Sequence, residues 1–165
     1  MDRNEAYLNA QHYCTYQERS QQEVRDKLYS LGMHSNDVEN ILADLITGNF
    51  LNEERFARAY AGGKFRINGW GKNKIRHGLM QKKVSPKCIE LGLQAIDKDD
   101  YHAELKKILS QKLESKDEKN PLKKKHKAAQ HAIGKGFESG LVWDVIREGH
   151  HENLEFNINR TLRRT

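Results

Sequence analysis

Apolar residues recur every three or four positions along most of this chain, with charged and amide side chains between them. This spacing predicts a series of amphipathic helices, each with one buried face. The intervening polar residues are mostly good helix formers, and only two prolines occur. The composition and the pattern together predict an all-α protein.

Capping residues and glycines mark helix boundaries at short intervals. Ser20 and Glu23 have the spacing of a capping box, in which each side chain accepts a hydrogen bond from the other residue's backbone N–H. We expect the helix that follows to stop at Gly32. Further helices are expected to start at Ser35 or Asn36, Asn52, Gly71, Ser85-Pro86 and Asn120-Pro121, with breaks at Gly48 and Asn68-Gly69.

The apolar pattern repeats along the chain. A shift of 51 positions takes Val24, Leu28, Met33, Val38, Leu42 and Leu45 to Ile75, Leu79, Val84, Ile89, Leu93 and Ile96. A fainter third copy follows at a shift of 53, which takes Leu79, Val84, Ile89 and Leu93 to Ala132, Phe137, Val142 and Ile146. Gly136 then occupies the position that Gly32 and Lys83 hold in the other copies.

This repeat predicts three tandem three-helix modules, over residues 4–50, 51–97 and 98–149. A module of this size buries little surface alone, so we expect the modules to stack into an elongated, curved array. Residues 150–165 are expected to form a basic C-terminal tail with a short or frayed helix.

Several classes of protein are disfavoured by what the sequence lacks. No run of about 18 apolar residues is present, and the first ten residues lack the apolar core of a signal peptide. Cys14 and Cys88 are too far apart for a metal or redox motif, and the eight histidines are scattered. Phosphate-loop, dinucleotide-binding and H-E-x-x-H motifs are missing. We therefore expect a cytoplasmic protein that is not an enzyme and uses no cofactor or metal.

Charge is distributed unevenly along the chain. The first module is acidic, because residues 1–54 carry four basic and ten acidic side chains. Residues 55–89 carry ten basic and no acidic side chain, although the net charge of the whole chain is only +6. Such a basic block favours a polyanionic partner or an acidic protein groove over a merely solvated face.

The basic block surrounds an abrupt helix break at Gly69-Trp70-Gly71. Its glycines allow a sharp bend, and the helix after it is expected to offer free N–H groups and a positive dipole end. Trp70 is expected either to stack on a base or partner, or to close the core above a tight turn. We expect Lys72, Arg76 and Lys83 to lie close to one helix face. The predicted partner- or DNA-binding residues are Arg66, Trp70, Lys72, Lys74, Arg76, Lys82 and Lys83, with a second contact at Lys123, Lys124, Lys125 and Lys127.

These residues also carry a family resemblance. The segment Leu51–Tyr60, followed by Arg66, Gly69-Trp70-Gly71, Ile75, Leu79 and Lys82-Lys83-Val84, resembles the RecX family of bacterial regulatory proteins. So do Tyr16, Arg19-Ser20, Glu23-Val24, Leu28 and Gly32 in the first copy. The resemblance covers residues 7–96. Lys83 stands where the family usually has glycine, and the third copy departs most from the family pattern.

The resemblance implies a modulator of the RecA recombinase, generally a negative one, that acts in DNA repair, recombination and the SOS response. Such proteins consist of three-helix repeats and lie in the deep groove of the RecA–single-stranded DNA filament. There they hinder strand exchange and ATP hydrolysis, without catalytic residues or a cofactor of their own. We expect a monomer with no membrane contact that binds DNA weakly when alone.

Two other functions remain open from the residues themselves. The chain could be a stand-alone, non-specific DNA-binding protein, whose affinity would fall steeply with salt. It could also be a structural adaptor for an unrelated acidic protein, which would show neither DNA binding nor an effect on RecA.

Overall fold

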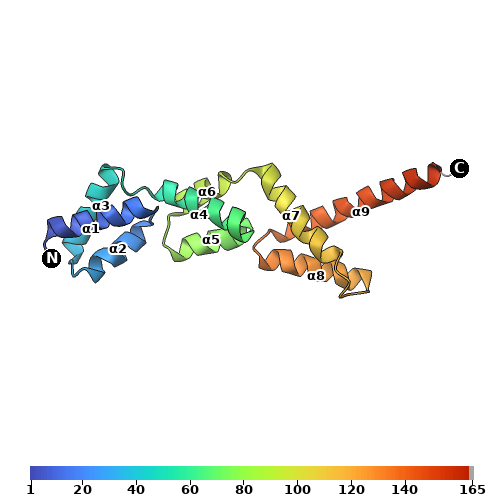
Figure 1. Cartoon of the computed structure of the whole chain (residues 1–165), viewed down its shortest axis with the longest axis horizontal. Coiled ribbons are helices and arrows are strands. Elements are labelled where there is room, and N and C mark those ends of the chain that lie inside the picture. Colours follow the sequence, from blue (N-terminus) through green and yellow to red (C-terminus); the bar gives the residue numbers. More distant parts are fainter. Residues whose placement is uncertain (164–165) are drawn as a thin grey trace. The chain divides into compact units, whose positions relative to one another are not determined.

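The computed structural model describes residues 1–163, apart from the side chains of residues 150–158 and 161. This described part contains helices and no strand (Figure 1). The helices are α1 (Arg3–Tyr16), α2 (Gln21–Ser30), α3 (Ser35–Thr47), α4 (Glu53–Asn68), α5 (Lys72–Gln81), α6 (Pro86–Gln94), α7 (Lys98–Leu113), α8 (Pro121–Gly134) and α9 (Ser139–Leu162). The predicted all-α repeat architecture is confirmed.

Most of the predicted helix caps are present. Ser20 and Glu23 form the complete capping box of α2, with N–H···O distances of 2.9 and 3.1 Å. The Asn52 side chain accepts from the N–H of Arg55 at 2.8 Å, three residues on, and so caps α4. Ser85 and Asn120 cap α6 and α8. These contacts span three residues or fewer, which is why the sequence alone could predict them.

The predicted start of α3 is wrong by one or two residues. His34 occupies the N-cap position, not Ser35 or Asn36, and its side chain makes no capping hydrogen bond. Ser35 is the first helical residue. Two residues of the type that favours the N-cap position follow each other here, so the pattern did not decide between them. In the structure neither is the N-cap of α3.

The three-fold repeat is visible in the backbone. Gly32, Lys83 and Gly136 all have positive φ angles, of 85°, 57° and 101°. In each copy the next residue donates its N–H to the carbonyl five positions back: Met33 to Leu28 at 3.1 Å, Val84 to Leu79 at 3.2 Å and Phe137 to Ala132 at 3.2 Å. This is the hydrogen bond of a Schellman helix end. The equivalence inferred from apolar spacing is therefore an equivalence of conformation.

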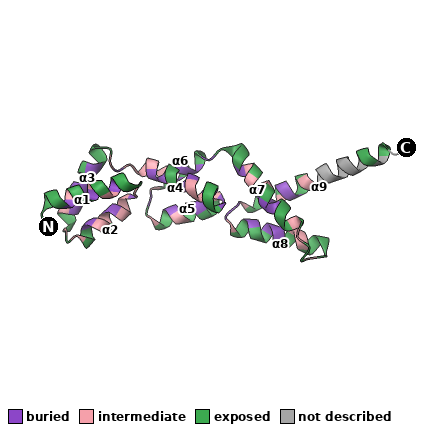
Figure 2. Ribbon diagram, in the orientation of Figure 1, coloured by how far each residue is buried: buried purple, intermediate pink, exposed green. Residues whose placement is uncertain are grey.

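The chain divides into two compact units. Unit 1 comprises Met1–Asn68 and Ile75–Ile96, and unit 2 comprises Gly69–Lys74 together with the chain from Asp97 onward. In unit 1, α1 packs on α2 and α3, and α4 packs on α6. In unit 2, α7 and α9 pack on each other and both pack on α8. Figure 2 shows buried positions alternating with exposed ones along these helices.

The boundaries of the three predicted modules and the tail stay a prediction. α9 runs as one helix from Ser139 to Leu162, through the position where the third module was expected to give way to the tail. Six residues of the predicted second module, Gly69–Lys74, belong to the same compact unit as the predicted third module.

Candidate partner-binding surface

The Gly69-Trp70-Gly71 corner lies in unit 2, where it docks on the turn between α8 and α9. The N–H groups of Gly71, Lys72 and Asn73 donate to the Lys135 carbonyl (2.8 Å), the Tyr101 hydroxyl (3.0 Å) and the Gly136 carbonyl (2.9 Å). These are the first N–H groups of α5 and the residue before it. The expectation that the start of α5 offers free N–H groups to a ligand is therefore wrong for these three.

Glycine is required at the two positions of the corner for different physical reasons. Gly69 has a φ of 65°, a conformation that strains residues with a side chain. A Cβ on Gly71 would lie 2.2 Å from the Phe137 nitrogen and 2.3 Å from the Gly136 carbonyl carbon. Gly136 in turn faces the Lys74 backbone, where a Cβ would lie 2.6 Å from the nitrogen. The two backbones are in direct contact because neither glycine carries a side chain.

Two lysine side chains of this corner lie against aromatic rings. Trp70 is half-buried, and the Lys74 ammonium lies 4.6 Å from the centre of its ring. The Lys72 ammonium lies 5.0 Å from the centre of the Tyr101 ring. Tyr101 also donates its hydroxyl to Glu138 and packs against Phe137, with ring centres 5.0 Å apart. The corner is thus a packed turn, and stacking of Trp70 on a partner stays a prediction.

Two of the predicted binding cations form ion pairs within unit 1. Arg76 on α5 pairs with Glu90 on α6 at 3.1 Å. Lys82 pairs at 2.7 Å with Glu23, the same carboxylate that completes the capping box of α2. These side chains are partly exposed, so each pair contributes little net stability. Their charge is nevertheless partly neutralised, which lowers their value as anion-binding groups.

The Arg76–Glu90 pair is itself part of the repeat. A shift of 51 positions takes Arg25 and Glu39 to Arg76 and Glu90, and Arg25 pairs with Glu39 at 2.8 Å. A shift of 53 leads to Ala129 and Trp143 in the third copy, where no such pair is possible. The sequence did contain a signal for this ion pair, an arginine and a glutamate 14 residues apart in both copies, but the pair was not predicted.

The basic block includes three cations of unit 1 that have no carboxylate partner among the described residues: Arg66, Lys83 and Lys87. All three are exposed. The Arg66 guanidinium lies back along α4 over Gly62, where a Cβ would come within 2.8 Å of it. Lys83 lies after the end of α5 in a left-handed conformation. The expectation that it shares a helix face with Lys72 and Arg76 is therefore wrong. Lys87 is absent from the predicted set.

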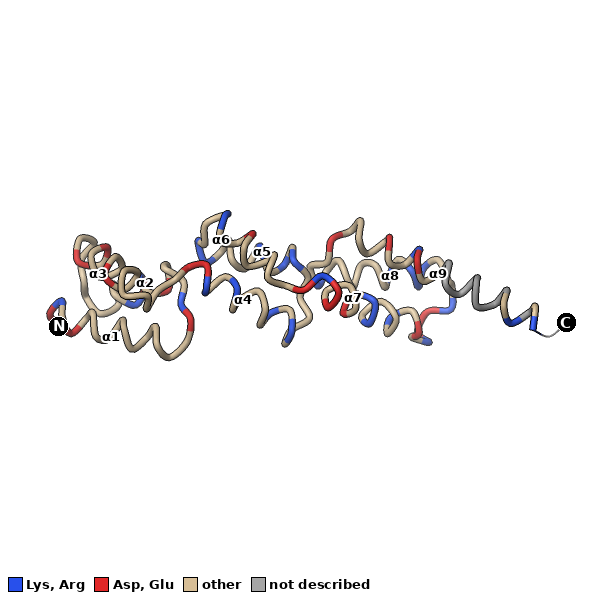
Figure 3. Tube along the Cα trace, turned by 90° about the horizontal axis from the view of Figure 1, so that it is seen from above, with Lys and Arg blue, Asp and Glu red and all other residues tan. Residues whose placement is uncertain are grey.

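The structure thus divides the first set of predicted residues. Trp70, Lys72 and Lys74 belong to unit 2, whereas Arg66, Arg76, Lys82 and Lys83 belong to unit 1. Figure 3 marks the Lys and Arg positions along α4, α5 and α6. No carboxylate interrupts them between residues 55 and 89. Their role as a binding surface stays a prediction.

The second basic run begins at the first turn of α8. Asn120 caps this turn by accepting from the N–H groups of Leu122 and Lys123. Lys127 pairs with Glu118 at 3.1 Å. The N–H of Asn120, together with Lys127, lowers the pKa of the Glu118 carboxyl. Lys123 is exposed, and Lys124 and Lys125 are half-buried. One of the four predicted cations is therefore already paired.

Within the part of the chain that it describes, no three His, Cys, Asp or Glu side chains are placed to hold a metal ion. None of the described helices combines the length and apolar character needed to cross a membrane.

Comparison with known proteins identifies the family. Residues 6–45 match the model of the first three-helix domain of RecX, and residues 52–93 match that of the second. The chain belongs to the RecX family. A regulatory protein RecX of Clostridium botulinum (strain Eklund 17B) is 31% identical over 132 residues, which cover 79% of this chain and 61% of that protein. The regulatory protein RecX of Streptococcus agalactiae is 30% identical, over 92% of this chain and 56% of that protein.

Solved RecX structures share the fold. The crystal structure of RecX from Lactobacillus salivarius has a TM-score of 0.82 at 23% identity, covering 88% of this chain and 95% of that one. A second RecX crystal structure has a TM-score of 0.78, also at 23% identity, covering 88% of this chain and 71% of that one. The chain spans little more than half the length of the curated relatives named above.

Proposed function

We propose that this RecX-family chain is a non-enzymatic regulator that binds the RecA–single-stranded DNA filament and inhibits its ATPase and strand-exchange activities. The observation that carries the proposal is the acid-free segment 55–89, which includes the exposed cations Arg66, Lys83 and Lys87, without a carboxylate partner among the described residues. A DNA-containing filament is a polyanion, and such a surface attracts it. The relatives, named regulatory protein RecX, support a regulatory role.

The charge pattern suits a partner that is part protein and part nucleic acid. The second module supplies a positive surface for phosphates or for acidic protein groups, and the first module is acidic. A surface of both signs contacts a mixed filament more favourably than it contacts bare DNA. The chain is proposed to act as a monomer in the cytoplasm, and to bind DNA weakly when RecA is absent.

The first test is a titration of RecA ATPase activity on single-stranded DNA. The chain is added from well below to well above the RecA concentration. Inhibition below equimolar ratios is expected, because one regulator bound to a filament affects many subunits. A protein that only competes for DNA must coat the lattice before it inhibits. Inhibition that appears only at coating ratios, and disappears with added salt, would favour the stand-alone DNA-binding function.

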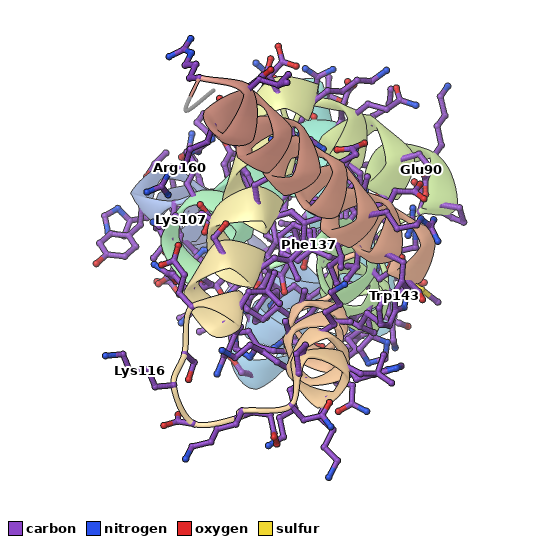
Figure 4. All side chains as sticks on the ribbon, turned by 90° about the vertical axis from the view of Figure 1, so that its right-hand side faces the viewer. Glu90, Lys107, Lys116, Phe137, Trp143 and Arg160 are labelled. Atoms are coloured by element: carbon purple, nitrogen blue, oxygen red, sulfur yellow. The ribbon has the colours of Figure 1, made fainter. Side chains whose placement is uncertain are left out.

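A charge-reversal variant tests the surface. The triple variant Arg66→Glu, Lys83→Glu, Lys87→Glu changes exposed side chains that have no carboxylate partner among the described residues. We expect this variant to need a concentration at least about tenfold higher than wild type for the same inhibition. The control reverses Lys98, Lys107 and Lys116, which are exposed in unit 2 outside the predicted site; Figure 4 labels the last two. The control has the same net charge as the test variant, so equal losses in both would refute the assignment of the surface.

A further inference from the structure

A pocket of about 370 Å³ lies in unit 1 between α5 and α6. It is lined by Arg76, Met80, Val84, Pro86, Ile89 and Glu90. Val84 and Ile89 are almost fully buried and form its apolar floor, whereas Met80 is 59% exposed. In the other copies the corresponding helices, α2 with α3 and α8 with α9, pack directly on each other. The pocket volume falls at the lower end of the range of about 300–1,000 Å³ that binding sites occupy.

The exposure of Met80 recurs in the repeat. The equivalent residues are Tyr29 in the first copy and Ile133 in the third, which are 48% and 39% exposed. Single exposed apolar residues are ordinary on protein surfaces. A large apolar side chain exposed at the same helix position in all three copies contributes little to any of the three cores. In the second copy it borders a pocket, and a methionine side chain adapts readily to a partner's shape.

The charges beside this pocket that have no carboxylate partner among the described residues are positive. Lys83 and Lys87 adjoin the lining residues Val84 and Pro86, are exposed, and have no carboxylate partner among the described residues. The lining carboxylate, Glu90, is held by Arg76 at 3.1 Å. The positive end of the α6 dipole lies at Pro86. A segment that binds here is therefore favoured if it carries carboxylates beside its apolar group.

We infer that this pocket, the Met80 pocket, receives one aliphatic or aromatic side chain from an acidic segment of a partner protein, whose carboxylates contact Lys83 and Lys87. A nucleic-acid base fits the lining less well, because bases stack on aromatic rings or guanidinium planes. The lining holds no aromatic ring, and its guanidinium is tied to Glu90. The assignment of this segment to RecA rests on the proposed function. The preference of the pocket for an acidic segment with one apolar side chain is independent of that function.

The first arm of the test uses a probe peptide and the full chain. The probe is a fluorescein-labelled peptide of about twelve residues, mostly Asp and Glu, with one central Phe; a second peptide has Gly in place of Phe. Met80→Gln is the test variant, and Ile67→Gln, 84% exposed and outside the pocket, is the matched control. We expect Met80→Gln to weaken binding of the Phe peptide about five- to tenfold, and Ile67→Gln to leave it unchanged. Circular dichroism checks that both variants fold.

The second arm repeats the RecA ATPase titration with the same variants. Met80→Gln is expected to need about five- to tenfold more protein for inhibition, while its affinity for single-stranded DNA alone is unchanged. Sensitivity of either arm to Met80→Gln, but not to Ile67→Gln, supports the inference. If the wild-type chain leaves RecA unaffected but binds the Phe peptide through Met80, the proposed function fails and the pocket stands.

Other outcomes overturn the inference. If Met80→Gln behaves as wild type in both arms, the pocket is not a contact, even where wild-type inhibition supports the proposed function. Equal binding of the Phe and Gly peptides, displaced by an oligonucleotide, would indicate a purely electrostatic surface. Sedimentation that shows a dimer abolished by Met80→Gln would indicate that a second copy of this chain occupies the pocket.

Discussion

Replacement of Gly71 by alanine should unfold the corner that joins Gly69–Lys74 to the rest of unit 2. The added Cβ would lie 2.2 Å from the Phe137 nitrogen, 2.3 Å from the Gly136 carbonyl carbon and 2.5 Å from its oxygen. Ordinary van der Waals contacts of a Cβ begin at about 3.4 Å, so the two backbone segments must separate by about 1 Å. Both segments are main chain and neither can rotate away as a side chain would.

The magnitude follows from what that separation breaks. Two short backbone hydrogen bonds, Gly71 to Lys135 at 2.8 Å and Asn73 to Gly136 at 2.9 Å, would be lost or lengthened. Each contributes about 1 kcal/mol net. Steric overpacking in a tight site costs a further 1–3 kcal/mol or so. We therefore expect Gly71→Ala to lower the free energy of unfolding of unit 2 by about 3–5 kcal/mol, near the upper end for one substitution.

Urea unfolding followed by circular dichroism measures the total effect, and hydrogen exchange read by mass spectrometry locates it. Amide protection should fall at residues 69–74 and 135–137 and stay unchanged in α1–α3. Gly63→Ala is the matched control, because nothing lies within 4 Å of its Cβ position in α4. That change should stabilise the chain by about 0.5–1 kcal/mol. A Gly71→Ala protein that unfolds at the wild-type urea concentration would refute the reasoning.

Three further predictions concern unit 1. Lys83→Gly should raise the free energy of unfolding by about 1 kcal/mol in urea titrations, because glycine adopts the φ of 57° without strain. Lys83→Ala removes the charge but keeps a Cβ, so it should not raise the free energy of unfolding. A double-mutant cycle on Arg76 and Glu90 should give a coupling below about 1 kcal/mol, since both side chains are partly exposed; a larger value would contradict the exposed geometry. Burial raises the pKa of the Cys14 thiol, so iodoacetamide at pH 8 should alkylate Cys88 first by peptide mass spectrometry, and faster labelling of Cys14 would show that its site opens readily.

The residues of the candidate binding surface were only partly predictable. The basic block and its lack of acids are properties of the sequence, but which cations are neutralised depends on the fold. Lys82 meets Glu23 across 59 positions of sequence, and no spacing rule connects them. Lys87 and Met80 were missed because the sequence pattern gave neither residue any particular importance. The match of Met80 with Tyr29 and Ile133 in the repeat was the signal that could have singled it out.

The sequence by itself determined the helices, most of their caps and the repeat. Caps and Schellman ends are made by residues three to five positions apart, and a buried helical face must show its periodicity in the chain. Only the tertiary structure decided that Gly71 and Gly136, 65 positions apart, bring two backbones into contact, and that the start of α5 binds its own chain. Apolar spacing records which face of a helix is buried, but the partner it meets is chosen by the packing of the whole unit.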